Sequence, residues 1–169
     1  MIECEVDGLN FFFPENWKVA KYDDWAFYRN QFSRMWNEIK AVDMIAFDPL
    51  STIWFIEVKD YRTNQRTKPT RLSDEVARKV FDTLAAILPA KVNASNAEEK
   101  AMASNIAVNS RKIRVVLHLE QPRQSSKLFP RAISPADVQQ KLRQLLRPVD
   151  SHPVVVEKND MRHLGWSVR

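Results

Sequence analysis

Glycine is scarce in this sequence, because only Gly8 and Gly165 occur among 169 residues. A glycine-rich loop that cradles phosphates cannot be built from two isolated glycines, which argues against nucleotide-binding enzymes of the P-loop and Rossmann kinds. Cysteine is scarcer still, since Cys4 is the only one. A single cysteine excludes an intramolecular disulfide and any zinc cluster made of cysteines.

Long hydrophobic runs are missing as well. The longest apolar stretches are far too short to cross a bilayer and no signal peptide opens the chain, so we expect a cytoplasmic protein without membrane contact. With 44% hydrophobic and 28% charged residues, the composition is that of a folded protein, and the length suits a single domain, residues 1–169. A net charge of +5 favours a polyanionic partner, although many basic proteins bind none.

Hydrophobic periodicity and turn residues predict a mixed α/β chain. The expected strands are residues 2–13 (one or two strands), 41–47, 52–59, 113–119, 153–157 and, as a candidate closing strand, 166–168. Helices are expected over residues 22–38, from Ser73 onward, from a Ser95–Glu98 capping box to about residue 108, and from Ser134–Pro135. This order indicates a sheet covered by helices.

The stretch IWFIEVKDYR, residues 53–62, begins as a buried strand and ends in charged residues. A DPLS turn joins it to the preceding strand, and a turn centred on Leu50 places Asp43 directly opposite Glu57. Lys59 lies two residues beyond Glu57 and points to the same face. Both faces of the pair are otherwise apolar, so the three charged side chains are expected to gather at one end of it.

Two opposed carboxylates repel each other unless a cation lies between them. Mg²⁺, or Mn²⁺ in its place, takes oxygen ligands, usually one or two carboxylates completed by water and substrate phosphate. An adjacent lysine can orient a water molecule and meet the charge that develops on a phosphate. The pattern therefore predicts a metal site for phosphodiester hydrolysis. The competing interpretation is a salt bridge at the end of a strand, between Lys59 and Asp43 or Glu57.

The run VDMIAFDPLSTIWFIEVKDYR resembles the PD-(D/E)xK superfamily, the restriction-endonuclease-like nucleases that include archaeal Holliday-junction resolvases. Asp43, Glu57 and Lys59 occupy the positions of the D…ExK signature, and the resemblance is tight over residues 41–62. Beyond that range it depends on element order. The order matches the family core of a helix, three strands, a helix and a strand, provided that one N-terminal strand joins the sheet.

The resemblance implies a restriction-endonuclease-like fold, a mixed sheet flanked by helices, and Mg²⁺-dependent hydrolysis of DNA that leaves a 5′-phosphate. Asp43 and Glu57 would be metal ligands together with the backbone carbonyl of Val58, and Lys59 would position the attacking water. One departure is Val42, which stands where the family name has proline. Another is that the polar helix residue which some members use after the lysine has no clear counterpart.

Many members also place an acid on the first helix, and Asp24 and Glu38 both compete for that role. Basic residues that could contact phosphates follow the predicted site: Arg62, Arg66, Lys68, Arg71, Arg78 and Lys79. A solvated loop and helix face explains these residues equally well when they are taken alone, but beside a metal site the phosphate-binding interpretation gains.

Two further functions remain open on the sequence. One is a nuclease fold that binds nucleic acid without cutting it. The other is a protein-interaction subunit of a larger defence or repair complex, in which the charged trio is incidental. The oligomeric state stays open as well, with a homodimer as one candidate.

Overall fold

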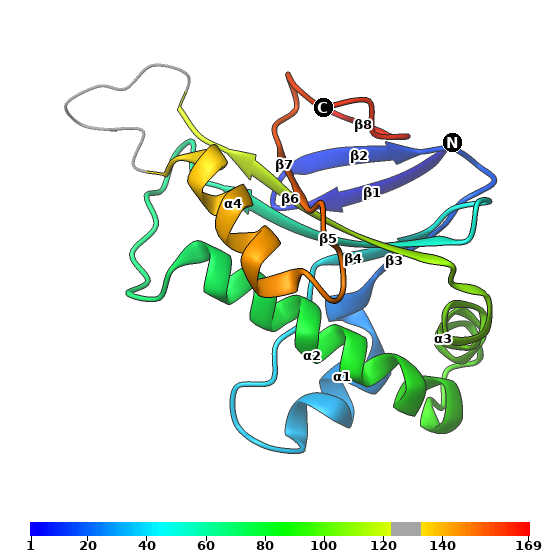
Figure 1. Cartoon of the computed structure of the whole chain (residues 1–169). Coiled ribbons are helices and arrows are strands. Elements are labelled where there is room, and N and C mark those ends of the chain that lie inside the picture. Colours follow the sequence, from blue (N-terminus) through cyan, green and yellow to red (C-terminus); the bar gives the residue numbers. More distant parts are fainter. Residues whose placement is uncertain (123–132) are drawn as a thin grey trace.

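The computed structural model describes residues 1–122 and 133–169. Its strands form two sheets, and the α-helices lie against one side of the larger sheet (Figure 1). The larger sheet has the order β3-β4-β5-β6-β7, with the bounds Lys18–Lys21, Met44–Phe47, Thr52–Asp60, Lys112–Glu120 and Val154–Val156. The smaller sheet has the order β1-β2-β8, with the bounds Ile2–Val6, Leu9–Phe13 and Ser167–Val168.

Four α-helices and two 3-10 turns complete the described residues: η1 (Tyr22–Asp24), α1 (Ala26–Asn30), η2 (Phe32–Arg34), α2 (Leu72–Asn93), α3 (Ala97–Asn109) and α4 (Pro135–Leu146). The predicted mixed α/β class is thereby confirmed. No helix in the described ranges is both long enough and apolar enough to cross a membrane.

The continuous helix predicted over residues 22–38 is wrong. The chain there forms only the short pieces η1, α1 and η2. The first two backbone N–H groups of α1, those of Ala26 and Phe27, donate to the carboxylate of Glu99 on α3 at 2.7 and 3.0 Å. A buried acid from a distant helix therefore satisfies donors that a helix start leaves open, and it fixes α1 against the helical layer.

The larger sheet combines a meander with two crossovers. Strands β3, β4 and β5 pair antiparallel, whereas β5–β6 and β6–β7 pair parallel. Parallel neighbours need long connections, which α2 with α3 supplies in the first case and α4 in the second. The strands predicted within residues 2–13 form β1 and β2 of the smaller sheet, and the N-terminal strand that joins the larger sheet is β3, which the sequence did not predict. The short helix α1, however, follows β3 in the chain, whereas the family core has its first helix before the three strands.

The hairpin of β4 and β5 has the predicted register. Met44 pairs with Ile56 and Phe47 with Ile53, so the pairing is symmetric about Leu50. The predicted turn centre at Leu50 is therefore confirmed. Continued to the residue before the start of β4, the same register brings Asp43 opposite Glu57.

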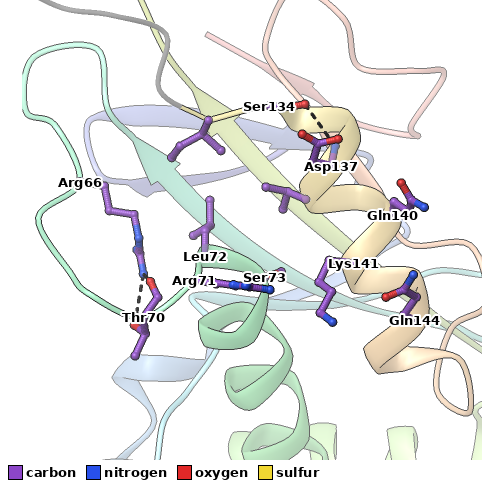
Figure 2. Close-up of a pocket in the computed structure, with 12 residues that line it drawn as sticks. Arg66, Thr70, Arg71, Leu72, Ser73, Ser134, Asp137, Gln140, Lys141 and Gln144 are labelled. Carbon is purple, nitrogen blue, oxygen red and sulfur yellow. Dashed lines mark hydrogen bonds between the residues drawn. The ribbon is translucent and has the colours of Figure 1, made fainter.

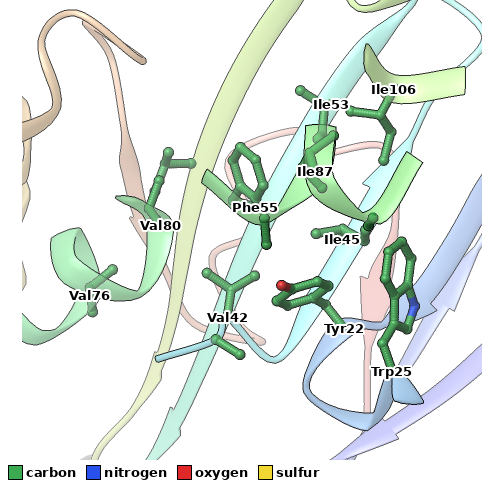
Figure 3. Packing of buried hydrophobic residues seen from close by; sticks show 14 of the residues in the cluster. Tyr22, Trp25, Val42, Ile45, Ile53, Phe55, Val76, Val80, Ile87 and Ile106 are labelled. Atoms are coloured by element: carbon green, nitrogen blue, oxygen red, sulfur yellow. The ribbon is translucent and has the colours of Figure 1, made fainter. Parts of the chain in front are cut away.

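Strand β5 is buried on both faces. Ile45 and Phe55 of the hairpin pack in one cluster with Val76, Val80 and Ile87 of α2 (Figure 3). On the opposite face, hairpin residues pack against the smaller sheet in a second cluster that includes Met44, Ile56 and Val58 with Phe11 and Phe13. The molecule therefore has three layers, and any charge near the end of β5 lies in a largely apolar setting.

Candidate functional site

The end of the β4–β5 hairpin brings the three signature side chains together. Glu57 is 1% exposed, and its Oε1 lies 2.6 Å from Lys59 Nζ. Asp43 stands one residue before β4, and its Oδ2 accepts a hydrogen bond of 2.6 Å from the backbone N–H of Val58. The Asp43 carboxylate thus takes over from strand β4 as the acceptor for β5 at the point where the ladder between these two strands ends.

Helix α2 contributes two charged residues to the same site, Glu75 and Lys79, one turn apart. Lys79 Nζ lies 2.6 Å from Glu57 Oε1 and 3.7 Å from Asp43 Oδ1. Lys59 Nζ, on the other side, lies 3.7 Å from Glu75 Oε1. The site is therefore an alternating cluster of carboxylates and ammonium groups that joins the helical layer to the sheet.

Lys79 is one of the six residues that the sequence predicts to contact phosphates. Its side chain is 15% exposed and lies between the carboxylates of Asp43 and Glu57. Its position in the sequence carried a usable signal. Lys79 lies three residues after the buried Val76 and directly before the buried Val80, so it flanks the apolar stripe by which α2 faces the sheet.

The cluster raises the pKa values of both Glu57 and Lys59. Burial raises the pKa of Glu57 to about 7, with a further contribution from the nearby Asp43 carboxylate, and the two lysines oppose this rise. Burial would lower the pKa of Lys59, but Glu57, Asp43 and Glu75 outweigh it and raise that pKa above its usual range. Lys59 is therefore a cation at neutral pH.

Glu75 forms ion pairs both with Lys59 of the site and with two cations of the loop before α2, Arg66 and Lys68. Burial alone would raise its pKa, but hydrogen bonds from Lys68 and Arg66 and the charge of Lys59 lower the pKa to about 2. Arg66 lies 2.7 Å from Glu75 Oε2, and Lys68 lies 3.0 Å from Glu75 Oε1. Glu75 is thus ionised throughout the physiological range and anchors the loop before α2.

A fourth acid near the site is Asp23 of η1, which the sequence did not indicate as a site residue. Burial and the Asp43 carboxylate raise the pKa of Asp23, and its Oδ1 is buried without a hydrogen-bond partner among the described residues. Its neighbour Asp24, which we had considered as the first-helix acid, pairs instead with Lys21 and Arg29.

Four of the site residues, Asp23, Asp43, Glu75 and Lys79, line a cleft of about 520 Å³. Glu38, the other first-helix candidate from the sequence, lines it as well. Asp74 is a fifth acid in the lining, and Lys40, Lys68 and Arg78 join Lys79 as cations, so acids exceed cations there by five to four.

The basic residues after the hairpin are mostly paired. Arg62 lies 2.6 Å from Asp60, and Arg78 lies 2.9 Å from Asp82, while Arg66 and Lys68 contact Glu75 as described above. Of the six predicted phosphate-binding residues, only Arg71 makes no ion pair within the described part of the chain. Pairing leaves a far smaller free positive charge than the sequence suggests.

No cluster of three or more His, Cys, Asp or Glu side chains in the described ranges has the arrangement of a metal centre. Asp43 and Glu57 could hold a cation as a pair of carboxylates, which is the number that Mg²⁺ commonly takes from a protein.

Comparison with known proteins gives one partial similarity. No protein-family model matches the chain, and no solved structure matches it. The chain is similar to a cysteine--tRNA ligase of Neisseria meningitidis serogroup A / serotype 4A (strain DSM 15465 / Z2491), with 31% identity over 201 residues. That alignment covers 95% of this chain but 28% of the ligase, so the chain spans little more than a quarter of the relative's length.

Proposed function

We propose that this protein is a Mg²⁺-dependent nuclease with a restriction-endonuclease-like fold that hydrolyses phosphodiester bonds in DNA. The observation that carries the proposal is the meeting of Asp43, Glu57 and Lys59 at the end of one hairpin, beside a cleft that Asp43 lines. The antiparallel meander followed by a helical crossover to a parallel strand supports the same fold assignment.

The residues present fit a magnesium ion. Glu57 Oε2 is buried and has no hydrogen-bond partner among the described residues, so one carboxylate oxygen is left for a cation. Asp43, Glu57 and the carbonyl of Val58 would hold the ion, and the ion would stabilise the negative charge on the departing oxygen.

The lysines differ in what they can contribute. Lys59 keeps its proton, because its pKa lies above the usual range, so it acts as a hydrogen-bond donor that orients the attacking water. Lys79 supplies the positive charge between Asp43 and Glu57 when no metal is bound. It is then close enough to the site to turn toward a substrate phosphate once a divalent cation takes over that charge.

A second candidate function is a module that binds nucleic acid without cutting it. Two lysines share Glu57 Oε1, and a backbone N–H occupies Asp43 Oδ2, so the cluster is already well satisfied without metal. The partial similarity to a protein named for tRNA makes RNA a reasonable ligand for such a module.

The test is a panel of plasmid, linear, single-stranded and four-way-junction DNA together with tRNA, incubated with Mg²⁺, Mn²⁺ or EDTA. Cleavage that needs a divalent cation and is lost in Lys59→Ala supports the nuclease and excludes a contaminating enzyme. Binding without cleavage supports the second candidate. If the protein neither binds nor cleaves any of these substrates, both candidate functions are wrong.

A further inference from the structure

A second cleft, of about 510 Å³, lies between the start of α2 and helix α4 (Figure 2). Its lining comes from the loop that enters α2 on one side and from the first three turns of α4 on the other. The apolar part of the lining consists of Leu72, Ile133 and Val138. Thr70 lines this cleft and also the cleft of the candidate site, so the two depressions adjoin.

The cations of the second cleft are not equally free. Arg66 is engaged, since it lies 2.7 Å from Glu75 and donates to the Thr70 carbonyl at 2.8 Å. Arg71 and Lys141, from the two opposite walls, make no ion pair within the described ranges. One acid, Asp137, also lines the cleft, next to Ser134 at the first turn of α4.

Two amide side chains, Gln140 and Gln144, stand one helical turn apart on the α4 wall and can both donate and accept hydrogen bonds. Cations on both walls suit a chain of phosphates better than a single anion, which one wall could bind. An apolar lining with flanking amides suits the bases of the same strand.

We propose that this second cleft binds the phosphodiester backbone of a nucleic-acid strand through Arg71 and Lys141, as an extension of the candidate site across Thr70. One part of this proposal rests on the proposed function, namely that the same nucleic-acid strand reaches Asp43 and Glu57. Binding in the second cleft itself requires no catalysis.

The experiment compares two double variants that lose the same charge. Arg71→Ala/Lys141→Ala empties the second cleft of free cations. Lys100→Ala/Arg143→Ala removes exposed cations from α3 and from α4 outside the cleft. Affinity for a labelled single-stranded DNA of about 20 nucleotides, and separately for tRNA, is measured in EDTA between about 50 and 200 mM salt.

We expect the cleft variant to bind about tenfold more weakly, with a salt slope lower by about 1.5 units, because two phosphate contacts are lost. The matched variant should stay within about twofold of the parent. The conservative pair Arg71→Lys/Lys141→Arg should retain most of the affinity. Equal losses in the cleft variant and the matched variant would overturn the proposal, as would parent protein that binds neither nucleic acid.

Failure of this inference and failure of the proposed function give different results. If the parent cleaves DNA but the cleft variant binds nucleic acid as tightly as the parent, the proposal for the second cleft is wrong and the nuclease proposal stands. If the parent never cleaves DNA, but affinity for nucleic acid falls in the cleft variant alone, the proposal for the second cleft stands and the nuclease proposal is wrong. The DNA and tRNA arms show which strand chemistry the cleft accepts.

Discussion

Lys79 Nζ and Glu57 Oε1 lie 2.6 Å apart where helix α2 meets strand β5. Lys59 Nζ lies at the same distance from the same oxygen, so two ammonium groups share one oxygen of a buried carboxylate while its other oxygen, Oε2, has no hydrogen-bond partner in the described structure. Breaking one side of such a pair leaves charge buried without compensation, which makes the contact sensitive to substitution.

Lys79→Met should reduce the free energy of unfolding by about 1–3 kcal/mol at pH 7, less than a complete loss of the pair because Lys59 remains beside Glu57. The pKa of Glu57 should rise further above 7. Denaturant unfolding measures the first effect, and carbon NMR of labelled glutamate measures the second. Lys91→Met, near the C-terminal end of α2, is the control and should change stability by less than about 0.5 kcal/mol. Equal effects of the two substitutions would show that the buried pair contributes nothing.

The raised pKa of Glu57 predicts how stability changes with pH. The pKa moves from the usual 4.5 to about 7, so the folded state holds the proton more tightly than the unfolded state does. The stability from this group is fully present below pH 4.5 and is lost as the pH rises through 7, an effect of about 3 kcal/mol. Glu57→Gln should flatten the decline between pH 5 and pH 8 in urea unfolding. If the free energy of unfolding of Glu57→Gln declines with pH as steeply as that of the parent, other groups cause the decline.

The register of the hairpin could be predicted from the sequence because it depends on residues that are close together in the chain. The period of two along a strand and a turn centred on Leu50 are enough to bring Asp43 opposite Glu57 and to set Lys59 on the same face. The contribution of α2 could not be derived in the same way. Whether Lys79 meets Glu57 depends on how the helix is rotated and packed against the sheet, which no local pattern specifies.

The region of residues 22–38 shows how a periodic pattern can mislead. Its aromatic residues lie near helical spacing, yet the buried ones are Tyr22, Trp25, Phe27 and Phe32, and the chain reaches those positions through short turns. Burial of large rings outweighs helix propensity there, because propensity is a weak preference that tertiary packing overrides. The displaced path also brings Asp23 to the site instead of Asp24.

Asp43→Asn should abolish Mg²⁺-dependent cleavage while leaving the metal-free protein at least as stable as the parent. The asparagine Oδ1 can still accept the hydrogen bond from Val58, and the substitution removes a charge that raises the pKa of Glu57 and of Asp23. Thermal melts in EDTA and in Mg²⁺, beside a cleavage assay, test this. The parent should gain stability from Mg²⁺ by mass action and the variant should gain little. A variant that melts well below the parent in EDTA would instead make Asp43 a structural salt-bridge partner.

Glu75→Gln should weaken the fold and strengthen nucleic-acid binding. The substitution frees Arg66 and Lys68 from their common partner, so two more cations become available beside the cleft. Because the pKa of Glu75 is lowered to about 2, its stabilising effect is present above pH 4.5 and is lost as the pH falls toward 2. We expect a loss of about 1–2 kcal/mol at pH 7 and a steeper salt dependence of DNA binding. Asp74→Asn, a neighbour on the same helix turn, should do neither.

Asp23 and Asp24 are adjacent acids with opposite surroundings, so they form a matched pair for the last prediction. Asp23 has a buried oxygen without a partner and a pKa raised by burial and by Asp43, which is the setting of a group that a cation would relieve. Asp24 pairs with Lys21 and Arg29 at the surface.

Asp23→Asn should therefore leave the melting temperature in EDTA unchanged or higher, but reduce the increase that Mg²⁺ produces. Asp24→Asn should cost less than about 1 kcal/mol through its exposed ion pairs and leave the Mg²⁺ response intact. Melts of both variants across a Mg²⁺ titration distinguish the two acids. If Asp24→Asn suppresses the Mg²⁺ response and Asp23→Asn does not, then the acid that helps to bind the cation is the one at the surface, and the buried oxygen of Asp23 has no part in the site.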